Sequence, residues 1–266
     1  MLYLLFLLTI PWKDLTSMSK LSQMSYGYKK FCQPTTYYAD SEECTLKQQK
    51  ITDISELSPQ GNVIKFIENE KDLECIIHKN VKKKRYTIIF RGTESAEDWR
   101  NNLNVLKVSL DKRVTVHNGF LKQLTNNESY DKIKETVESS RNNNYDWWLT
   151  GHSAGGGLAI LCSYLLSKEY PDKSFTVVSI ASPKVGGKGF SQEFKQMKNL
   201  KCWRVIYDKD IVPLLPPMGY SHVGKLITLS SNEGKKLRLR NIVTDHHINS
   251  YVAALTKLSN PRAKFF

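Results

Sequence analysis

Short apolar runs alternate with helically spaced segments along the chain, and this alternation predicts the fold class. Runs typical of β-strands occupy residues 63–67, 73–78, 86–90, 147–150, 175–181 and 203–207. Apolar residues at i, i+4 predict helices over 120–140 and 158–166, and a short helix is expected near Phe190. Strands that alternate with helices indicate parallel strands joined by crossover helices. We therefore expect an α/β fold, a mostly parallel central sheet with helices on both faces.

Near the C-terminus, residues 236–240 alternate strictly between basic and apolar side chains and predict an exposed edge strand. Neither an internal repeat nor a Pro- or Gly-rich linker divides the chain. The sequence thus predicts one domain over 17–266, which begins with an amphipathic helix at 17–30 and is preceded by an apolar segment at 1–16.

The apolar N-terminal segment indicates where in or outside the cell the protein is located. Residues 2–12 are uncharged and almost wholly apolar, a length that suits the core of a signal peptide and is too short to span a bilayer. No basic residue precedes the run and no A-x-A-like cleavage site follows it, so an anchor lying in a membrane interface is the alternative. We expect a secreted or membrane-associated protein, with the cytoplasm as the alternative location.

The 266 residues are 40% hydrophobic and carry 39 Lys and Arg against 26 Asp and Glu, a formal charge of +13. This excess favours anionic partners, either nucleic acid or acidic lipid head groups, and composition alone does not choose between them. The densest basic run, 82–85, directly precedes a predicted strand and is interpreted as a hairpin turn. Without a zinc-finger or RNA-recognition signature beside it, we expect no nucleic-acid binding and treat an anionic membrane surface as the candidate partner.

The five cysteines are odd in number and widely spread, with no C-x-x-C pair, so we expect no thiolate metal site. Cys75, Cys162 and Cys202 lie in apolar stretches and are predicted to be small buried side chains. Cys32 and Cys44 flank a polar stretch and are candidates for a disulfide if the protein is exported.

The chemistry-bearing motif lies at 147–155, where an apolar strand enters the pattern G-x-S-x-G and a helically spaced run follows. Strand, tight turn and helix are the context of a nucleophile elbow, which exposes the Ser153 hydroxyl at a helix N-terminus. There the backbone N–H groups and the helix dipole favour developing negative charge. The glycines are expected because the turn is strained and brings strand and helix close together.

The elbow, read as Gly151-His152-Ser153-Ala154-Gly155-Gly156, resembles that of the class 3, or fungal-type, triacylglycerol lipases. Further blocks similar to that family's follow in order at 90–93, 116–120, 182–186 and 210–217, although Lys184 stands where the family usually has Arg. The resemblance spans about residues 20–255 and implies an α/β-hydrolase fold and a serine esterase mechanism without metal or cofactor.

A serine nucleophile needs a base and an acid to orient it, in the chain order Ser, acid, His. Asp208 and Asp210 both follow the strand 203–207, and only Asp210 fits the family's D-I-V-P block. Three histidines follow: His222 resembles a family loop residue outside the triad, whereas His246 and His247 both lie near a D-H-x-x-x-Y ending. We assign His246 as the base, with His247 as the alternative.

The oxyanion of an acyl-transfer intermediate needs at least two donors. One is predicted to be the backbone N–H of Ala154, and the resemblance assigns the other to Thr93. The resemblance also implies a mobile lid over 94–106. In this segment Ala96 and Arg100 replace the family's bulkier apolar residues, which argues against strong interfacial activation.

The expected function is therefore a serine hydrolase that cleaves carboxylic esters of lipids, as an acylglycerol lipase does, through an acyl-enzyme on Ser153. A phospholipase A or a general carboxylesterase is the alternative. A catalytically silent basic lipid-binding protein is the hypothesis from another class, which the full set of candidate site residues disfavours.

Overall fold

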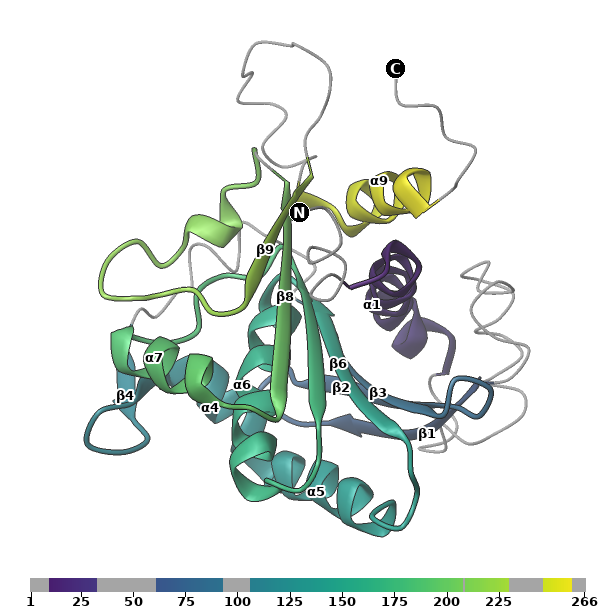
Figure 1. Ribbon diagram of the computed structural model, residues 1–266, viewed down its shortest axis with the longest axis horizontal. Coiled ribbons are helices and arrows are strands. Elements are labelled where there is room, and N and C mark those ends of the chain that lie inside the picture. The colour runs from purple at the N-terminus through teal and green to yellow at the C-terminus, as the bar shows by residue number, and fades with distance from the viewer. Residues whose placement is uncertain (1–9, 33–60, 93–105, 208, 230–245, 260–266) are drawn as a thin grey trace, which may run out of the picture.

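The computed structural model describes residues 10–32, 61–92, 106–207, 209–229 and 246–259, with backbone only for 27–32. A seven-stranded sheet runs through its centre (Figure 1). Its strands, in spatial order, are β1 (Gly61–Glu68), β2 (Glu74–Asn80), β3 (Arg85–Phe90), β6 (Asp146–His152), β7 (Phe175–Ile180), β8 (Leu200–Tyr207) and β9 (Lys225–Leu229). A small antiparallel pair joins β4 (Lys107–Ser109) to β5 (Thr115–His117). The helices are α1 (Trp12–Cys32), α4 (Asn118–Thr125), η3 (Asn126–Glu128), α5 (Ser129–Ser139), α6 (Ala154–Glu169), α7 (Lys188–Gln196), η4 (Val212–Leu214) and α9 (Ile248–Ser259).

The sheet is mixed but mostly parallel. β1, β2 and β3 pair antiparallel, whereas β3, β6, β7, β8 and β9 pair parallel in that order. The predicted fold class is therefore confirmed, including the antiparallel hairpin that Val81 to Lys84 close between β2 and β3.

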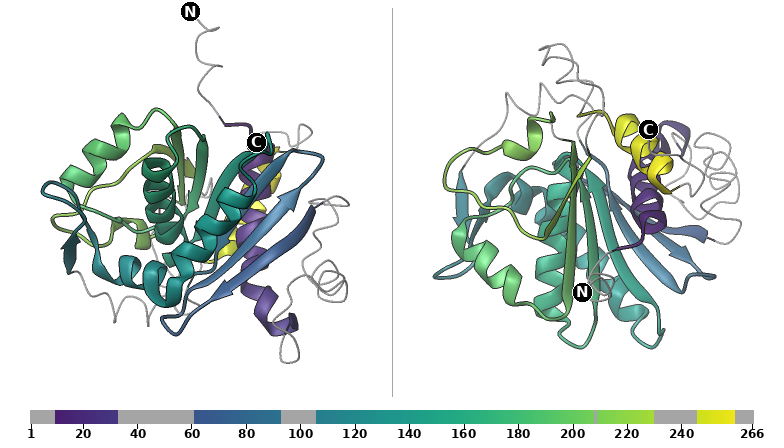
Figure 2. Two further views of the ribbon diagram at one scale, coloured as in Figure 1. Left: turned by 90° about the horizontal axis from the view of Figure 1, so that it is seen from below. Right: turned by 45° about the horizontal axis from the view of Figure 1, so that its top comes forward.

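Helices cover both faces of the sheet, as the two further views show (Figure 2). On one face α6 packs against β6 and β7, while α4 lies on α6; on the other, α1 crosses β6 beside α9. Each face carries a separate apolar core. Cys75, Cys162 and Cys202 are buried and unbridged, as predicted. The proposed pairing of Cys32 with Cys44 lies outside the described side chains.

Helix α1 begins earlier than the predicted helix at 17–30. The Pro11 carbonyl accepts the first helical bonds, from the N–H groups of Asp14 and Leu15. Ile10 and Leu15 are buried with the α9-facing core, so the predicted boundary at residue 16 falls within the first turns of a packed helix. In the described residues, no helix combines the length and the apolar character that crossing a bilayer requires.

The prediction of one continuous helix over 120–140 is wrong, because the structure has two helices there, α4 and α5. Asn127 and Glu128 have φ values of 49° and 58°, which break the segment into α4 and α5. The apolar pairs Phe120/Leu124 and Ile133/Val137 are nevertheless buried. A left-handed pair of residues shifts the helix axis without changing the apolar spacing on either side, so the pattern alone does not reveal it. The predicted edge strand at 236–240 lies outside the described residues.

Candidate active site

The turn between β6 and α6 presents Ser153 at the carboxyl edge of the parallel strands. Ser153 has φ 58° and ψ −127°, a strained conformation for a non-glycine residue. A Cβ on Gly151 would collide with the backbone of Gly155, and one on Gly155 with the Phe90 carbonyl oxygen. The glycines therefore permit the close approach of strand and helix, while the positive φ falls on the serine itself.

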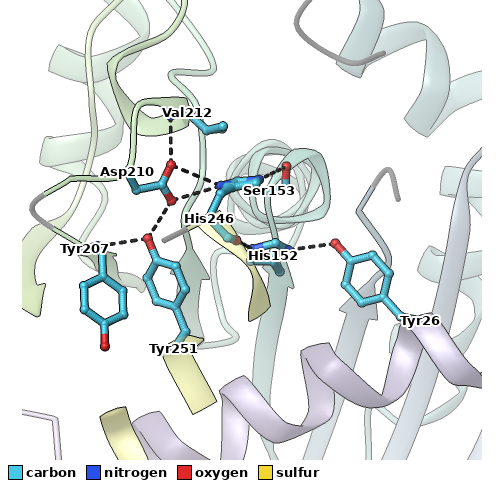
Figure 3. A network of polar contacts seen from close by, with 8 residues as sticks. All are labelled: Tyr26, His152, Ser153, Tyr207, Asp210, Val212, His246 and Tyr251. Atoms are coloured by element: carbon cyan, nitrogen blue, oxygen red, sulfur yellow. Dashed lines mark hydrogen bonds and ion pairs between the residues drawn. The ribbon is translucent and has the colours of Figure 1, made fainter. Parts of the chain in front are cut away.

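Three predicted site residues from distant parts of the chain meet at this turn (Figure 3). The Nε2 atom of His246 lies 3.0 Å from Oγ of Ser153, and its Nδ1 atom lies 2.9 Å and 3.1 Å from the two carboxylate oxygens of Asp210. A carboxylate accepts the Nδ1–H proton, which leaves the Nε2 lone pair facing the serine hydroxyl. This arrangement is able to withdraw a proton from Ser153 and to return it to a leaving group.

The carboxylate of Asp210 is fixed by two donors besides His246. The backbone N–H of Val212 donates to Oδ1 at 2.9 Å, and the Tyr251 hydroxyl donates to Oδ2 at 2.7 Å. Burial, followed by the nearby charge of Asp210, raises the pKa of Tyr251 far above its ordinary value, so this hydroxyl keeps its proton. Asp210 is therefore held as a buried carboxylate aimed at the imidazole.

A second histidine, His152, connects the base to helix α1 through hydrogen bonds. The Nε2 atom of His152 lies 2.7 Å from the His246 backbone oxygen, and its Nδ1 atom lies 2.7 Å from the Tyr26 hydroxyl. Because a carbonyl only accepts, Nε2 carries the proton and Tyr26 donates to Nδ1. Burial, and secondarily the neighbouring His246, lowers the pKa of His152 well below its ordinary value. The neutral His152 therefore links α1 to the backbone of His246.

Of the two predicted oxyanion donors, one is described. Ala154 is the first residue of α6, so its N–H has no acceptor within the helix, whereas the amides of Gly156 and Gly157 are bonded to the Ser153 carbonyl. Thr93, Asp208 and the predicted lid residues up to 105 lie outside the described residues. Ser153 itself is fully buried.

The remaining candidates occupy other positions. His247 is exposed and Ser250 N–H bonds to its carbonyl. His222 donates from Nε2 to the Pro213 carbonyl at 2.6 Å. Lys184, which replaces the family's usual Arg, donates to the carbonyls of Leu214 and Pro216 at 2.7 Å and 3.1 Å. His222 and Lys184 thus hold the loop that follows Asp210 and do not contribute to the Ser153 contacts.

Sequence reasoning missed the supporting residues of this site. Tyr251 is the tyrosine of the D-H-x-x-x-Y ending, but its bond to Asp210 was not predicted. Nothing in the sequence indicates Tyr26, which is 126 residues from its partner His152. A single sequence carries no signal for such a long-range contact between polar side chains.

Comparison with known proteins agrees with this geometry. The family model described as "Lipase (class 3)" matches residues 87–220, which is half of the chain. The chain belongs to the class 3 lipase family. The matched region contains the elbow, the predicted acid and the loop held by Lys184; His246, Tyr251 and helix α1 lie beyond it.

Curated relatives of the class 3 lipase chain include both lipases and phospholipases. It is 25% identical over 205 residues to Phospholipase A1-II 4 of Oryza sativa subsp. japonica, covering 67% of this chain and 52% of that protein. It is 26% identical over 181 residues to a lipase of Rhizomucor miehei, covering 63% and 48%. The chain thus spans about half the length of these relatives.

Solved structures share the fold. The triacylglyceride lipase of Rhizomucor miehei superimposes with a TM-score of 0.67 at 24% identity, covering 83% of this chain and 80% of that one. Lipase II from Rhizopus niveus gives a TM-score of 0.66 at 22% identity, covering 84% and 81%. At these identities the likeness establishes the fold alone.

Proposed function

We propose that this class 3 lipase chain is a serine hydrolase that cleaves carboxylic ester bonds of lipids. The single observation that carries the proposal is the continuous contact from Oγ of Ser153 through His246 to Asp210 at a strand–turn–helix elbow. Ser153 acts as nucleophile, His246 as general base and acid, and Asp210 as the carboxylate that orients the imidazole.

The reaction proceeds in two halves. The Ser153 oxygen attacks the ester carbonyl carbon while His246 Nε2 takes the hydroxyl proton, and the resulting oxyanion accepts hydrogen bonds from the Ala154 N–H and from Thr93. Collapse of the tetrahedral intermediate breaks the bond to the alcohol, which leaves with the proton from His246. Water then attacks the acyl-enzyme by the same route, releasing a carboxylic acid and restoring Ser153.

The candidate substrates are given in order of preference. Acylglycerols are the first choice, from the resemblance of the site blocks to triacylglycerol lipases. Phospholipids are the second, because several relatives are phospholipases A1 by name. A general carboxylesterase is the third candidate, and a catalytically silent lipid-binding protein is the alternative from another class.

The test is hydrolysis of labelled trioleoylglycerol and of phosphatidylcholine labelled at the first acyl position, each by the wild type and by Ser153→Ala. Fatty acid release from trioleoylglycerol that Ser153→Ala abolishes is expected. Preferential release from phosphatidylcholine makes the protein a phospholipase. Absence of release from both, and from short p-nitrophenyl esters, would leave the silent binding protein as the function.

We further propose that the chain associates with anionic lipid surfaces, on the ground of its formal charge of +13. Each Lys or Arg near an anionic leaflet contributes about 1 kcal/mol, an attraction that salt screens. Vesicle binding should rise with the anionic fraction and weaken from about 0.05 to 0.5 M salt. Equal binding to neutral and anionic vesicles would refute this partner.

A further inference from the structure

Arg204 is a buried arginine with no counter-charge among the residues that the structure describes. Its residue is only 9% exposed, and alternation along β8 puts its side chain on the same face as the buried Cys202, toward α6. Its Nε atom is buried without a hydrogen-bond partner. Among the described residues no carboxylate forms an ion pair with this guanidinium. A buried cation in this state is costly unless an acceptor is supplied.

A second unsatisfied polar atom lies beside it. Ser179 on β7 is the register partner of Arg204, and its buried Oγ also has no partner. Paired residues on neighbouring strands point to the same face, with the strands about 4.8 Å apart. The row continues to Gly151 on β6 and Leu226 on β9, neither of which has a polar side chain. Two buried polar atoms without a partner, Nε of Arg204 and Oγ of Ser179, therefore lie on neighbouring strands in one row.

The charged surroundings are positive. Burial, and next the charge of Arg204, lowers the pKa of Lys184, whose Nζ donates to the carbonyls of Leu214 and Pro216. Burial, followed by Arg204, lowers the pKa of His222 to about 4, so this imidazole is neutral at neutral pH. Arg204 and Lys184 thus repel each other without a compensating described carboxylate, and an anion would relieve both.

A basic cavity lies near this cluster. It has a volume of about 690 Å³ and is lined by His222, by Cys202, which precedes Arg204 by two residues on β8, and by Lys195, Lys201 and Lys225. Its one acidic lining residue, Asp14, is already paired with Arg85 at 2.9 Å. A cavity lined by several cations raises the local concentration of anions.

We propose that Arg204 and Ser179 hold a small inorganic anion, such as chloride or phosphate, with Lys184 supplying a second positive charge. The Arg204 N–H groups and the Ser179 hydroxyl donate to the ion. An anion is preferred to water because water neutralises neither cation. The site is independent of ester hydrolysis, and its test reads binding and not activity.

The test compares the Tm of the full chain in sodium chloride, sodium phosphate and sodium gluconate at equal ionic strength, near about 0.1 M, where general screening is the same. Gluconate is too large for a nine-tenths buried site. We expect chloride or phosphate to raise the Tm by about 2–4 °C above gluconate. Broadening of the chlorine NMR line of chloride by the protein, reversed by phosphate, provides a direct readout of the same site.

Three variants test whether the Tm rise comes from this site. Arg204→Gln should abolish the anion-specific Tm rise and the line broadening, whereas Arg141→Gln, which removes an exposed arginine, should keep both. Should Arg204→Gln not fold, Ser179→Ala removes one donor only and should reduce the Tm rise. Equal Tm values in all three salts, or a rise that survives Arg204→Gln or Ser179→Ala undiminished, would overturn the proposal.

Discussion

The Tyr251 hydroxyl donates a hydrogen bond of 2.7 Å to Oδ2 of Asp210 and accepts one of 2.9 Å from the backbone N–H of Tyr207. One side chain from α9 thus fixes both the candidate acid and the end of strand β8, which precedes it. Removing this oxygen leaves a buried carboxylate with one donor fewer and a backbone N–H without its acceptor.

Tyr251→Phe is therefore expected to lower the free energy of unfolding by about 1–3 kcal/mol and to reduce turnover. Urea unfolding and ester hydrolysis measure the two effects. Tyr164→Phe is the matched control, because that hydroxyl also donates to a carboxylate, that of Glu193 on α7. Tyr164 lies in α6, about three helical turns from Ser153. Loss of turnover in Tyr164→Phe equal to that in Tyr251→Phe would contradict the positioning role.

The two neighbouring histidines allow a sharp comparison. His246→Ala is expected to lower kcat by about 10²–10⁴-fold or more, because a single imidazole transfers the proton in both halves of the reaction. His247→Ala should change kcat little, since His247 is exposed and does not contact Ser153 or Asp210 in the structure. A larger loss of kcat in His247→Ala than in His246→Ala would identify His247 as the base.

Tyr26→Phe tests the link between α1 and the base. Without the hydroxyl, His152 loses the donor to Nδ1, and its hold on the His246 carbonyl weakens. Misplacement of a catalytic group costs about ten- to a hundredfold in rate, so kcat should fall by that amount while KM stays unchanged. A rise in KM with unchanged kcat would mean that Tyr26 acts on substrate binding instead.

His78 predicts a pH dependence of stability. Burial lowers its pKa from 6.5 to about 4, and a hydrogen bond with the Gly61 backbone offsets this only in part. Between these pKa values the unfolded chain binds more protons, so the free energy of unfolding falls as the pH decreases through this window. His78 alone should contribute a loss of about 2 kcal/mol from about pH 7.5 to 5.

Urea unfolding of the wild type and of His78→Gln at both pH values measures this contribution. The variant should lose less stability on acidification, whereas His247→Gln, which changes an exposed histidine, should follow the wild type. An identical pH dependence in His78→Gln and the wild type would show that His78 is not protonated on unfolding.

The sequence predicted the parts of the fold that depend on local pattern. Strand β6, the glycines of the elbow and helix α6 follow from apolar runs and from a turn that only small residues permit. Strand β9 was not predicted, and although Leu226, Ile227 and Leu229 are apolar, only Leu229 is buried in this edge strand. Helix α9 was not predicted, although its two buried residues, Tyr251 and Leu255, have the i, i+4 spacing of a helix.

The candidate site also contains residues that local sequence patterns predicted and residues that they did not. The structure brings Ser153, Asp210 and His246 together as their motifs suggested, and their catalytic roles remain a prediction. Other contacts join residues that are far apart in the sequence, so no local pattern predicts them. These are the Tyr26–His152 hydrogen bond and the pairing of Ser179 with Arg204. Residues 1–9, Thr93 and the lid residues 94–105 lie outside the described residues, so the expectations about them stay predictions.

The central claim, that Ser153 is an activated nucleophile, is tested most directly by a fluorophosphonate probe. The full chain is treated with and without detergent micelles, digested, and analysed by mass spectrometry, with heat-denatured protein and Ser153→Ala as controls. The account predicts one covalent adduct on Ser153 of the folded protein and none in either control. A folded protein that leaves Ser153 unmodified under both conditions, or that is labelled equally after denaturation, would contradict it.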